Sequence, residues 1–360
     1  MESRIGIALL GRGTVGGGVA ALLESRRAQL ERRSGVQYNV VGIAGRDRDP
    51  LALIDDRRVD LVIEAIGGTG VALECIERAL EARKHVVTAN KDAIATQGPR
   101  LRALAAAKGV TLRYEASVAS AVPIISTLDG ALAGDEILEI GGVLNGTCNF
   151  ILGLMREGHT FSEALSRAQV AGYAEADPRS DVDGIDAAHK LAILIQHAFL
   201  APVVTSAVPH SGIGGITTGA VRRARQHGYE IKLAGYAKRT QNEIRAQVGP
   251  VLVPFTHPFS KIDGVDNILR VRGAACGTLQ FSGPGAGREA AASAVLGDVV
   301  AALKAIAERH AVPRARHTNE ALEIKPAFEH FPVFAGLPIL TTSTKGDTHV
   351  GDSSRTLSAV

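Results

Sequence analysis

The sequence predicts an α/β protein: a parallel sheet covered by helices, followed by a second α+β domain. Short β-branched runs alternate with helix-like segments before residue 123, which is typical of a parallel sheet with both faces covered. A glycine-rich turn follows the first of these runs, and after residue 123 the alternation becomes irregular. At 360 residues the chain is also too long for one ordinary core, so we expect two domains.

The first domain is expected over residues 1–125. Its strands are runs rich in β-branched residues, and its helices have apolar residues at helical spacing. The expected strands are 5–10, 38–45, 59–68, 85–91 and 110–117, and the expected helices are 15–23, 72–84 and 98–109.

The second domain is expected over residues 126–287. Here the segments predict a strand, a turn and a helix, then two further helices, then strands. After a glycine turn one long helix is predicted, and residues 310–360, of which the last twenty are polar, are expected to form a tail without a separate regulatory domain. The segments in question are 137–152, 161–172, the helix that carries Lys190 to about His197, 243–254, 267–283 and the long helix 288–309.

Composition excludes several classes of protein. The 40 basic and 37 acidic residues leave a net charge of +3, without the concentrated basic stripe of a nucleic-acid-binding protein. The three cysteines are odd in number and in no metal-ligand spacing, which is typical of a reduced, cytoplasmic protein. The N-terminus lacks the pattern of a signal peptide, and we expect no membrane partner because no run of about 18 apolar residues is present.

The glycine-rich turn has the sequence Gly11-Arg12-Gly13-Thr14-Val15-Gly16, which is G-x-G-x-x-G between a strand and a helix. The first glycine permits a tight turn, the second lets a pyrophosphate approach the backbone, and the third lets the helix pack closely on the strand. The helix N-terminus then offers free N–H groups to the phosphates. This placement after the first strand predicts a Rossmann-type dinucleotide-binding domain.

The end of the second predicted strand bears on the choice between NAD and NADP. Arg46 and Arg48 are suited to the 2′-phosphate of NADP, whereas Asp47 is suited to the ribose hydroxyls of NAD. We favour NADP over NAD, and the alternative is that these side chains are solvated loop charges.

Residues 172–194 gather five carboxylates upstream of one lysine. Asp186 and Lys190 are four residues apart and share a helix face, and the residues that follow are apolar enough for a core. A lysine held by carboxylates at the mouth of a core helix can deliver a proton to a carbonyl oxygen, and the remaining acids can hold a substrate ammonium group. The alternative is a surface ion pair. The acids are Glu175, Asp177, Asp181, Asp183 and Asp186, of which Asp177 and Asp183 are expected to form turns.

The chain resembles the homoserine dehydrogenase family from residue 4 to about residue 309. The stretch GYAEADPRSDVDGIDAAHKLAIL (172–194) resembles the signature of that family almost throughout. Four further blocks match in order: HVVTANK (85–91), GGVLNGTCNFIL (141–152), HPFSKIDGVDNIL (257–269) and SGPGAG (282–287).

The resemblance implies reversible NAD(P)H-dependent reduction of aspartate β-semialdehyde to homoserine by a homodimer. It implies that Lys190 is catalytic, that Glu175 and Asp186 bind the substrate, and that the final helix, 288–309, completes the nucleotide domain. The other implied site residues are Asp181 and Lys91 near the reacting groups, and Ala89, Asn90, Lys91, Gly172 and Gly287 beside the cofactor.

The resemblance also implies a site for Na⁺ or K⁺. Glu115 and the carbonyls of Val118, Ser120 and Val122 correspond to its ligands. The family pattern there contains glycines, roughly V-x-G-G-x-P, whereas this chain reads VASAVP, so the loop is expected to bend differently.

Two other functions compete with this interpretation. An acylating semialdehyde dehydrogenase would use a nucleophilic cysteine, for which Cys148 is the candidate, although a small buried residue is the simpler interpretation. A dinucleotide-sensing protein would keep the fold without catalysis, but the intact set of acids and lysine argues against that loss.

Overall fold

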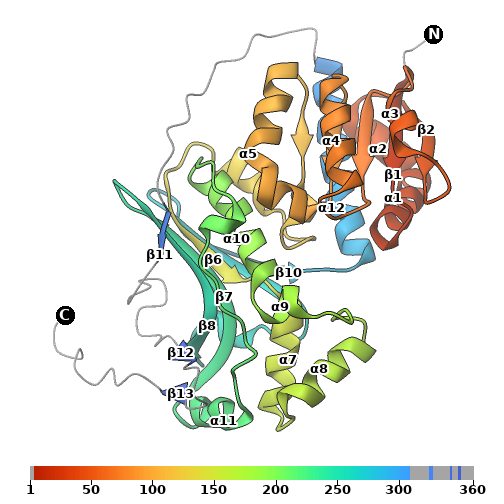
Figure 1. The fold of residues 1–360 in the computed structure, drawn as a ribbon. Helices are drawn as coiled ribbons and strands as arrows, with labels where there is room; N and C mark the ends of the chain where they lie inside the picture. The colour runs from red at the N-terminus through yellow and green to blue at the C-terminus, as the bar shows by residue number, and fades with distance from the viewer. Residues whose placement is uncertain (1–3, 309–323, 327–340, 343–347, 350–360) are drawn as a thin grey trace. The chain divides into compact units, whose positions relative to one another are not determined.

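The computed structural model describes residues 4–308, 324–326, 341–342 and 348–349. The chain divides into two compact units, and the ribbon in Figure 1 shows the elements of each. Unit 1 contains residues up to 133, together with 200–204 and the segment from 286 that carries the last long helix. Unit 2 contains 134–199 and 205–285 with the later strands.

Unit 1 is built on a five-stranded parallel sheet in the order β2-β1-β3-β4-β5. Its apolar strands are buried on both faces, as expected for a parallel sheet covered by helices. This confirms the predicted Rossmann-type arrangement. The strands are β1 (Ile5–Leu10), β2 (Tyr38–Ala44), β3 (Leu61–Glu64), β4 (His85–Thr88) and β5 (Leu112–Arg113).

Helices cover this sheet in two layers. α1, α2 and α12 pack together, and α12 also contacts β4, whereas α4 packs on α3, α5 and the two central strands β3 and β4 (Figure 1). The helices are α1 (Thr14–Ser25), α2 (Arg27–Ser34), α3 (Pro50–Ile54), α4 (Val71–Glu81), α5 (Lys91–Lys108), α6 (Ile124–Ser126) and α12 (Arg288–Ala307), with the short turns η1 (Glu115–Ser117) and η2 (Thr127–Ala131).

Helix α12 belongs to the core of unit 1. Val295, Val299 and Leu303 are fully buried and pack with residues of β1, α1 and β3. At Gly18 of α1, an added Cβ would lie 3.1 Å from the Cβ of Ala292, so the two helices approach closely. Among the described residues, α12 is the one helix with the length and hydropathy of a membrane span, and its buried side chains are those of a core helix.

Three predicted strands of unit 1 have clearly different bounds in the structure, and the first of them, 59–68, gives only Leu61–Glu64. The run 85–91 was expected to be a strand, but β4 ends at Thr88, because Asn90 caps α5 by accepting a hydrogen bond from the N–H of Ala93 at 3.0 Å. Lys91 is therefore the first residue of a helix. The run 110–117 gives only the two residues of β5, and Glu115 then begins the 3₁₀ turn η1.

Unit 2 is built on a mainly antiparallel sheet in the order β10-β9-β6-β7-β8-β11, which confirms the predicted α+β character. α7, α10 and α11 pack on β7, and β11 joins β8 in parallel. The elements are β6 (Ile137–Val143), α7 (Gly146–Arg156), α8 (Phe161–Val170), α9 (Arg179–Val182), α10 (Ile185–Ala198), η3 (Thr205–Ala207), α11 (Thr218–Gln226), β7 (Tyr229–Arg239), β8 (Ile244–Pro254), η4 (Pro258–Lys261), β9 (Asp266–Gly273), β10 (Gly277–Pro284) and β11 (Ile324–Pro326).

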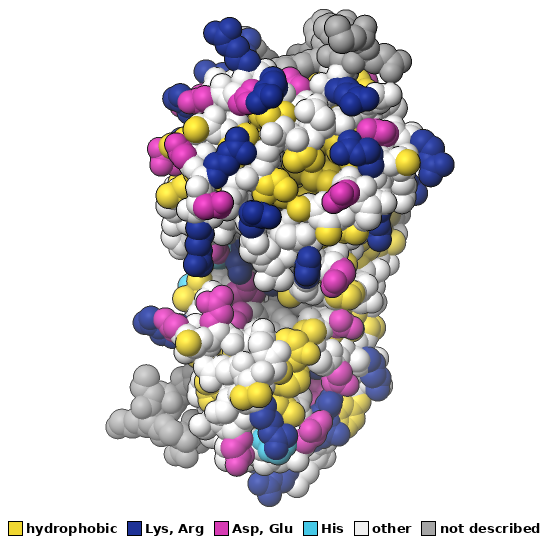
Figure 2. All heavy atoms as spheres, turned by 90° about the vertical axis from the view of Figure 1, so that its right-hand side faces the viewer, with side chains coloured by type: hydrophobic (Ala, Val, Ile, Leu, Met, Phe, Trp, Pro, Cys, Tyr) yellow, Lys and Arg dark blue, Asp and Glu magenta, His cyan; other side chains and the backbone are white. Residues whose placement is uncertain are grey.

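The strand β7 was not predicted from the sequence, and 267–283, which reads as one strand-like stretch, forms the hairpin β9–β10. The short strands β12 (Thr341–Thr342) and β13 (Thr348–His349) pair with each other. Most of the expected tail, 310–360, lies outside the described residues. On the face drawn in Figure 2, basic and acidic side chains are interspersed, in keeping with the small net charge.

Candidate active site

The three glycines of the G-x-G-x-x-G turn lie in different structural environments. Gly11 has φ +102°, and a Cβ there would lie 2.4 Å from the carbonyl oxygen of Ala65. At Gly16 a Cβ would lie 2.0 Å from the carbonyl oxygen of Gly11, so the helix could not approach the strand. Gly13, the N-cap of α1, has open space where its Cβ would be. The fold itself therefore requires Gly11 and Gly16, whereas Gly13 leaves its exposed backbone open to a ligand.

Charged side chains gather where β2 ends beside the glycine turn. A Cβ on Gly45 would lie 2.6 Å from a carboxylate oxygen of Asp47 and 3.1 Å from the Cδ of Arg12, so both side chains reach this point. Arg48 instead folds back on the sheet, where its guanidinium lies over Gly42 beside Leu53. Arg12, Arg46, Asp47 and Arg48 are all exposed.

A buried hydrogen-bond network joins the carboxyl ends of β3 and β4. Glu64, which is fully buried, accepts hydrogen bonds from the N–H groups of Ile66 and Gly67 at 2.7 and 3.0 Å and from the hydroxyl of Thr88 at 2.5 Å. The amide of Asn90 donates to the carbonyl of Gly68 at 2.7 Å. Burial raises the pKa of Glu64 above its ordinary value. The network fixes the loop at the carboxyl ends of β3 and β4, which is the edge where ligands bind in sheets of this kind.

Sequence reasoning missed Glu64 and Thr88, although it selected Asn90. The available signal was an acid and a hydroxyl at the ends of two neighbouring apolar strands. In the same unit, Ala89 precedes Asn90, Lys91 begins α5, and Gly287, with φ +122°, is the N-cap of α12.

The lysine and acids of unit 2 come together as a buried cluster. The side chain of Lys190 is 11% exposed, and its ammonium lies 2.9 Å from a carboxylate oxygen of Asp186, whose side chain is 5% exposed. The ammonium also donates to the carbonyl of Leu144 at 2.7 Å. The surface ion pair considered as the alternative is therefore wrong. A buried ion pair of this kind needs further hydrogen bonds to offset its desolvation. The carbonyl of Leu144 supplies one to Lys190, and the amide of Asn145 supplies one to Asp186.

Asn145 connects the acids of the cluster to each other. Its amide donates to Asp181 and to Asp186, in both cases at 2.7 Å, and it is buried at the end of β6. Asn145 was part of a matching block, but sequence reasoning gave it no role. The contacts span 36 and 41 residues of sequence, so no local spacing reveals them.

The loop between α8 and α9 holds Glu175 and Asp177, whereas Asp183 is the C-cap of α9. Glu175 is exposed, and its backbone carbonyl accepts a hydrogen bond from the side-chain amide of Gln169 at 3.1 Å. Asp177 forms the expected turn by accepting from the N–H of Arg179, and the guanidinium of Arg179 lowers the pKa of Asp177 to about 2. Gly172 ends α8 with φ +74°, a conformation that favours glycine at a helix end.

Cys148 is unsuited to nucleophilic attack. It is fully buried in α7, and burial, followed by the carboxylates of Asp181 and Asp186, raises the pKa of its thiol well above the ordinary value. A thiol with such a pKa is not a thiolate at neutral pH. Its Sγ contacts the carbonyl of Asp181 at 3.2 Å, which is a packing role.

The loop expected to bind a monovalent cation has an unusual backbone. Ala119 and Ser120 have φ values of +53° and +37°, the left-handed region that favours glycine. The family pattern has glycines at the positions of Ser120 and Ala121, so only Ser120 combines a family glycine position with a positive φ. Glu115, which is buried, accepts from the N–H groups of Ile125 and Ser126 at 2.8 and 2.7 Å and so holds the start of α6. The loop therefore takes a glycine-like conformation without glycines.

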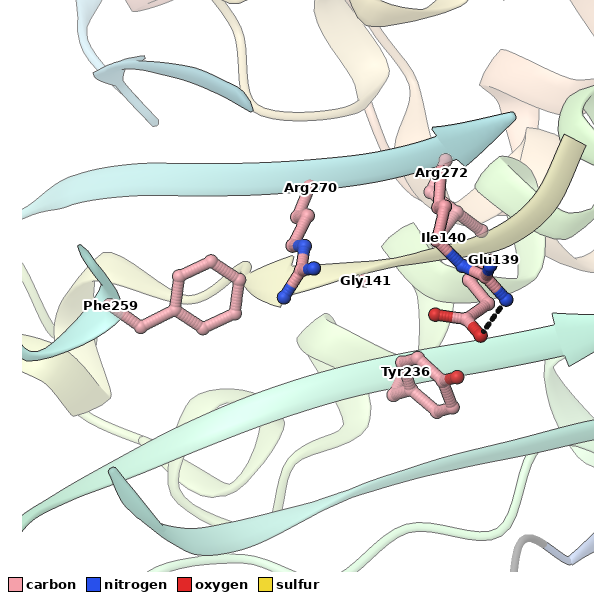
Figure 3. A pocket seen from close by; sticks show the side chains of 7 residues that line it. All are labelled: Glu139, Ile140, Gly141, Tyr236, Phe259, Arg270 and Arg272. Carbon is pink, nitrogen blue, oxygen red and sulfur yellow. Dashed lines mark hydrogen bonds and ion pairs between the residues drawn. The ribbon is translucent and has the colours of Figure 1, made fainter. Parts of the chain in front are cut away.

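A small enclosed depression lies on the other face of the unit 2 sheet (Figure 3). There Arg272 points toward Glu139 and lies 2.6 Å from it, next to Tyr236. Side chains alternate along a strand, and the neighbouring Gly235 faces Leu191 of α10. The group in Figure 3 therefore lies on the opposite face from α10 and does not belong to the lysine cluster.

Both units are similar to parts of known proteins. Residues 11–115 match the family model for the NAD binding domain of homoserine dehydrogenase, and residues 123–300 match the model for homoserine dehydrogenase. The homoserine dehydrogenase of Neisseria gonorrhoeae is 39% identical over 82% of this chain and 72% of its own length. That of Mycobacterium tuberculosis is 37% identical over all of this chain and 83% of its own length.

The fold agrees as well. A homoserine dehydrogenase structure from Thiobacillus denitrificans superposes with a TM-score of 0.86 at 39% identity, covering 91% of this chain and 81% of that one. Neither the acylating dehydrogenase nor the sensor is supported by these similarities. The chain belongs to the homoserine dehydrogenase family, whose members are NAD(P)-dependent oxidoreductases that act on a CH–OH group.

Proposed function

We propose that the protein catalyses the reversible NAD(P)H-dependent reduction of L-aspartate 4-semialdehyde to L-homoserine, a cytoplasmic step of threonine and methionine biosynthesis. The observation that supports this most is the buried cluster of Lys190, Asp186, Asn145 and Asp181. It places an ammonium group with a fixed direction beside two carboxylates, which suits an aldehyde substrate that carries an ammonium group of its own.

Lys190 is the proposed proton donor. Reduction of the aldehyde adds a hydride to carbon and a proton to oxygen, and the ammonium of Lys190 gives up that proton. Asp186 and the carbonyl of Leu144 hold two of its hydrogen-bonding directions, which leaves a third N–H for the substrate oxygen. In the reverse reaction the amine of Lys190 takes the proton from the hydroxyl of homoserine.

Acids hold the other end of the substrate. Asp186 and Asp181 each accept a hydrogen bond from Asn145, and they are the proposed acceptors for the ammonium group of the substrate. The exposed Glu175 is proposed to turn toward the substrate from its loop. Lys91, at the start of α5, is proposed to hold the reacting groups in position beside the cofactor.

The glycine turn and the ends of β3 and β4 are the proposed cofactor site. When bound, the nicotinamide supplies the hydride. Backbone N–H groups from Gly13 to Gly16 would face its pyrophosphate, with Arg12, Thr14 and Val15 alongside, and Ala89, Asn90, Gly172 and Gly287 are the remaining proposed contacts. We propose a preference for NADP because Arg46 and Arg48 follow β2, Arg12 reaches the same point from the glycine turn, and all three are exposed.

The loop 115–122 is the proposed site of Na⁺ or K⁺. Carboxylate and carbonyl oxygens are the hard donors that such ions prefer, and Glu115, Val118, Ser120 and Val122 supply them. The oxygens of Glu115 already accept one backbone hydrogen bond each, so the ion would share that carboxylate with α6. Its proposed role is to hold the loop in its left-handed conformation.

We also propose a homodimer. β10 lies at one edge of the unit 2 sheet, and its residues alternate between exposed and half-buried. Such an edge offers unpaired backbone groups to another strand. The proposed domain roles are a nucleotide domain of 1–125 with α12, and a catalytic and dimerisation domain of 126–287.

A steady-state assay tests the function directly. The purified chain is mixed with aspartate semialdehyde and either NADH or NADPH, with and without Na⁺ and K⁺, and absorbance of the reduced cofactor is followed. We expect oxidation of the cofactor that depends on the semialdehyde, a higher kcat/KM with NADPH, and a response to one of the cations. Cofactor binding without oxidation would instead support a sensor.

A further inference from the structure

Asn145 lies at the centre of the unit 2 cluster and uses every hydrogen-bonding group of its side chain. Its Nδ2 donates to Asp181 Oδ1 and to Asp186 Oδ2, both at 2.7 Å. Its Oδ1 accepts from the N–H of Cys148 at 2.7 Å, which caps α7. A flipped amide would place its oxygen against two carboxylates, so these three contacts fix its orientation.

The same carboxylate oxygen of Asp186 that accepts from Asn145 also pairs with Lys190, at 2.9 Å. The ammonium of Lys190 also donates to the carbonyl of Leu144, the residue before Asn145, at 2.7 Å. The dipeptide Leu144-Asn145, at the end of β6, therefore contacts the acids and the lysine together. It connects α9, α10 and the start of α7 at one point.

The chemistry of an amide suits this position better than that of a charged group. Two carboxylates close together repel each other unless a donor lies between them, and a cation there would neutralise them. The neutral amide gives each acid one hydrogen bond and leaves its charge in place. Asn145 therefore holds the two acids together without adding a charge of its own.

We propose that Asn145 is a positioning residue for the reaction. It holds Asp181 and Asp186 ionised and at a fixed separation, and through Asp186 it directs the ammonium of Lys190. This inference rests on the proposed function, because it assigns the reaction to that cluster. It gives α7 a role beyond packing, because the Asn145 side chain caps this helix through its Oδ1 and connects Asp181 with Asp186 through its Nδ2.

Two substitutions of Asn145 separate its capping of α7 from its hydrogen bonds to the two acids. Serine and aspartate both retain an N-cap acceptor, so Asn145→Ser and Asn145→Asp keep the start of α7, whereas neither provides two N–H donors. Asn149→Asp is the matched control. Asn149 is buried in the same helix, where its oxygen accepts from Lys232 at 2.7 Å, outside the cluster.

We expect Asn145→Ser to lower kcat/KM for the semialdehyde by about ten- to a hundredfold with an unchanged cofactor Kd. The acid limb of its pH profile should move to higher pH, because lost donors favour the protonated form of carboxylates. Asn145→Asp should lose more activity and regain part of it as the pH falls. Asn149→Asp should keep the kcat/KM and pH profile of the wild type.

The proposal is wrong if both Asn145 variants keep a kcat/KM within twofold of the wild type and an unshifted pH profile, because the side chain would then serve only as a cap. A readout independent of turnover is the unfolding free energy. Asn145→Asp should become less stable relative to the wild type as the pH rises from about 4 to 7, because a third carboxylate ionises there. An inactive wild type would refute the proposed function, whereas a flat stability difference would refute the role of Asn145.

Discussion

The glycine turn of unit 1 and the lysine cluster of unit 2 are built in opposite ways. The glycine turn is made by six consecutive residues, and its geometry depends on backbone groups and on missing Cβ atoms. The lysine cluster brings side chains from β6, α9 and α10 together over 36 to 46 residues of sequence. The glycine turn can therefore be predicted from its spacing and its place after a strand, whereas the surroundings of the buried lysine form only in the folded chain.

The largest expected effect tests the backbone side of this comparison. Gly16→Ala would place a Cβ 2.0 Å from the carbonyl oxygen of Gly11. We therefore expect the unfolding free energy to fall by about 1–3 kcal/mol and cofactor binding to be lost as well. Gly13→Ala meets open space and should cost at most about 1 kcal/mol, yet it should weaken cofactor binding. Urea unfolding and cofactor titration of both variants measure this. Equal stability of the two variants would contradict the claim that the fold requires Gly16 but not Gly13.

A second buried lysine tests the side-chain part of the comparison. Lys232 donates to Asn149 Oδ1, and the carboxylate nearest to it, that of Asp263, is 3.9 Å away and 57% exposed. Burial lowers the pKa of Lys232 to about 8 from 10.5. Between those pH values the unfolded chain binds more protons than the folded chain, so the unfolding free energy rises with pH.

The stability of the wild type relative to Lys232→Met should therefore increase by about 2–3 kcal/mol from pH 8 to 10.5. Below pH 8 the difference should be constant, because both states of the wild type are protonated. Urea unfolding at several pH values measures it. A difference that does not change with pH would mean that Lys232 is solvated like a surface lysine.

The loop 118–122 offers a smaller test of backbone control. Ala119 and Ser120 are held at positive φ, which costs about 1 kcal/mol per residue for a side chain that carries a Cβ. Because glycine also loses more entropy on folding, the double variant with glycine at both positions should gain only about 1 kcal/mol in stability. The control Ala116→Gly, in η1 at ordinary φ, should lose stability in the same thermal unfolding assay.

The smallest expected effect concerns Cys148. Because its thiol is fully buried and packs against the carbonyl of Asp181, Cys148→Ser should retain turnover and lose about 1 kcal/mol of stability. Abolished turnover in a folded variant would instead favour a thiol nucleophile.

Some features of the fold and of the lysine cluster could be predicted from the sequence, and others could not. The five strands of unit 1 and the pairing of Asp186 with Lys190 follow from periodicity and i,i+4 spacing. The strand β7 was missed because it is buried on both sides and lacks strict alternation. Asn145 and Glu64 were missed for a different reason, since their roles depend on partners that are distant in the sequence.

The most direct test of the account is the turnover of Lys190→Ala, measured with cofactor affinity in the same preparation. We expect kcat to fall by about 10²- to 10⁴-fold, as for the loss of a positioned proton donor, with an unchanged cofactor Kd. Lys304→Met, at an exposed position of α12, serves as the control and should behave as the wild type. Near-normal turnover by folded Lys190→Ala would contradict the central claim that the buried ammonium of unit 2 delivers the proton.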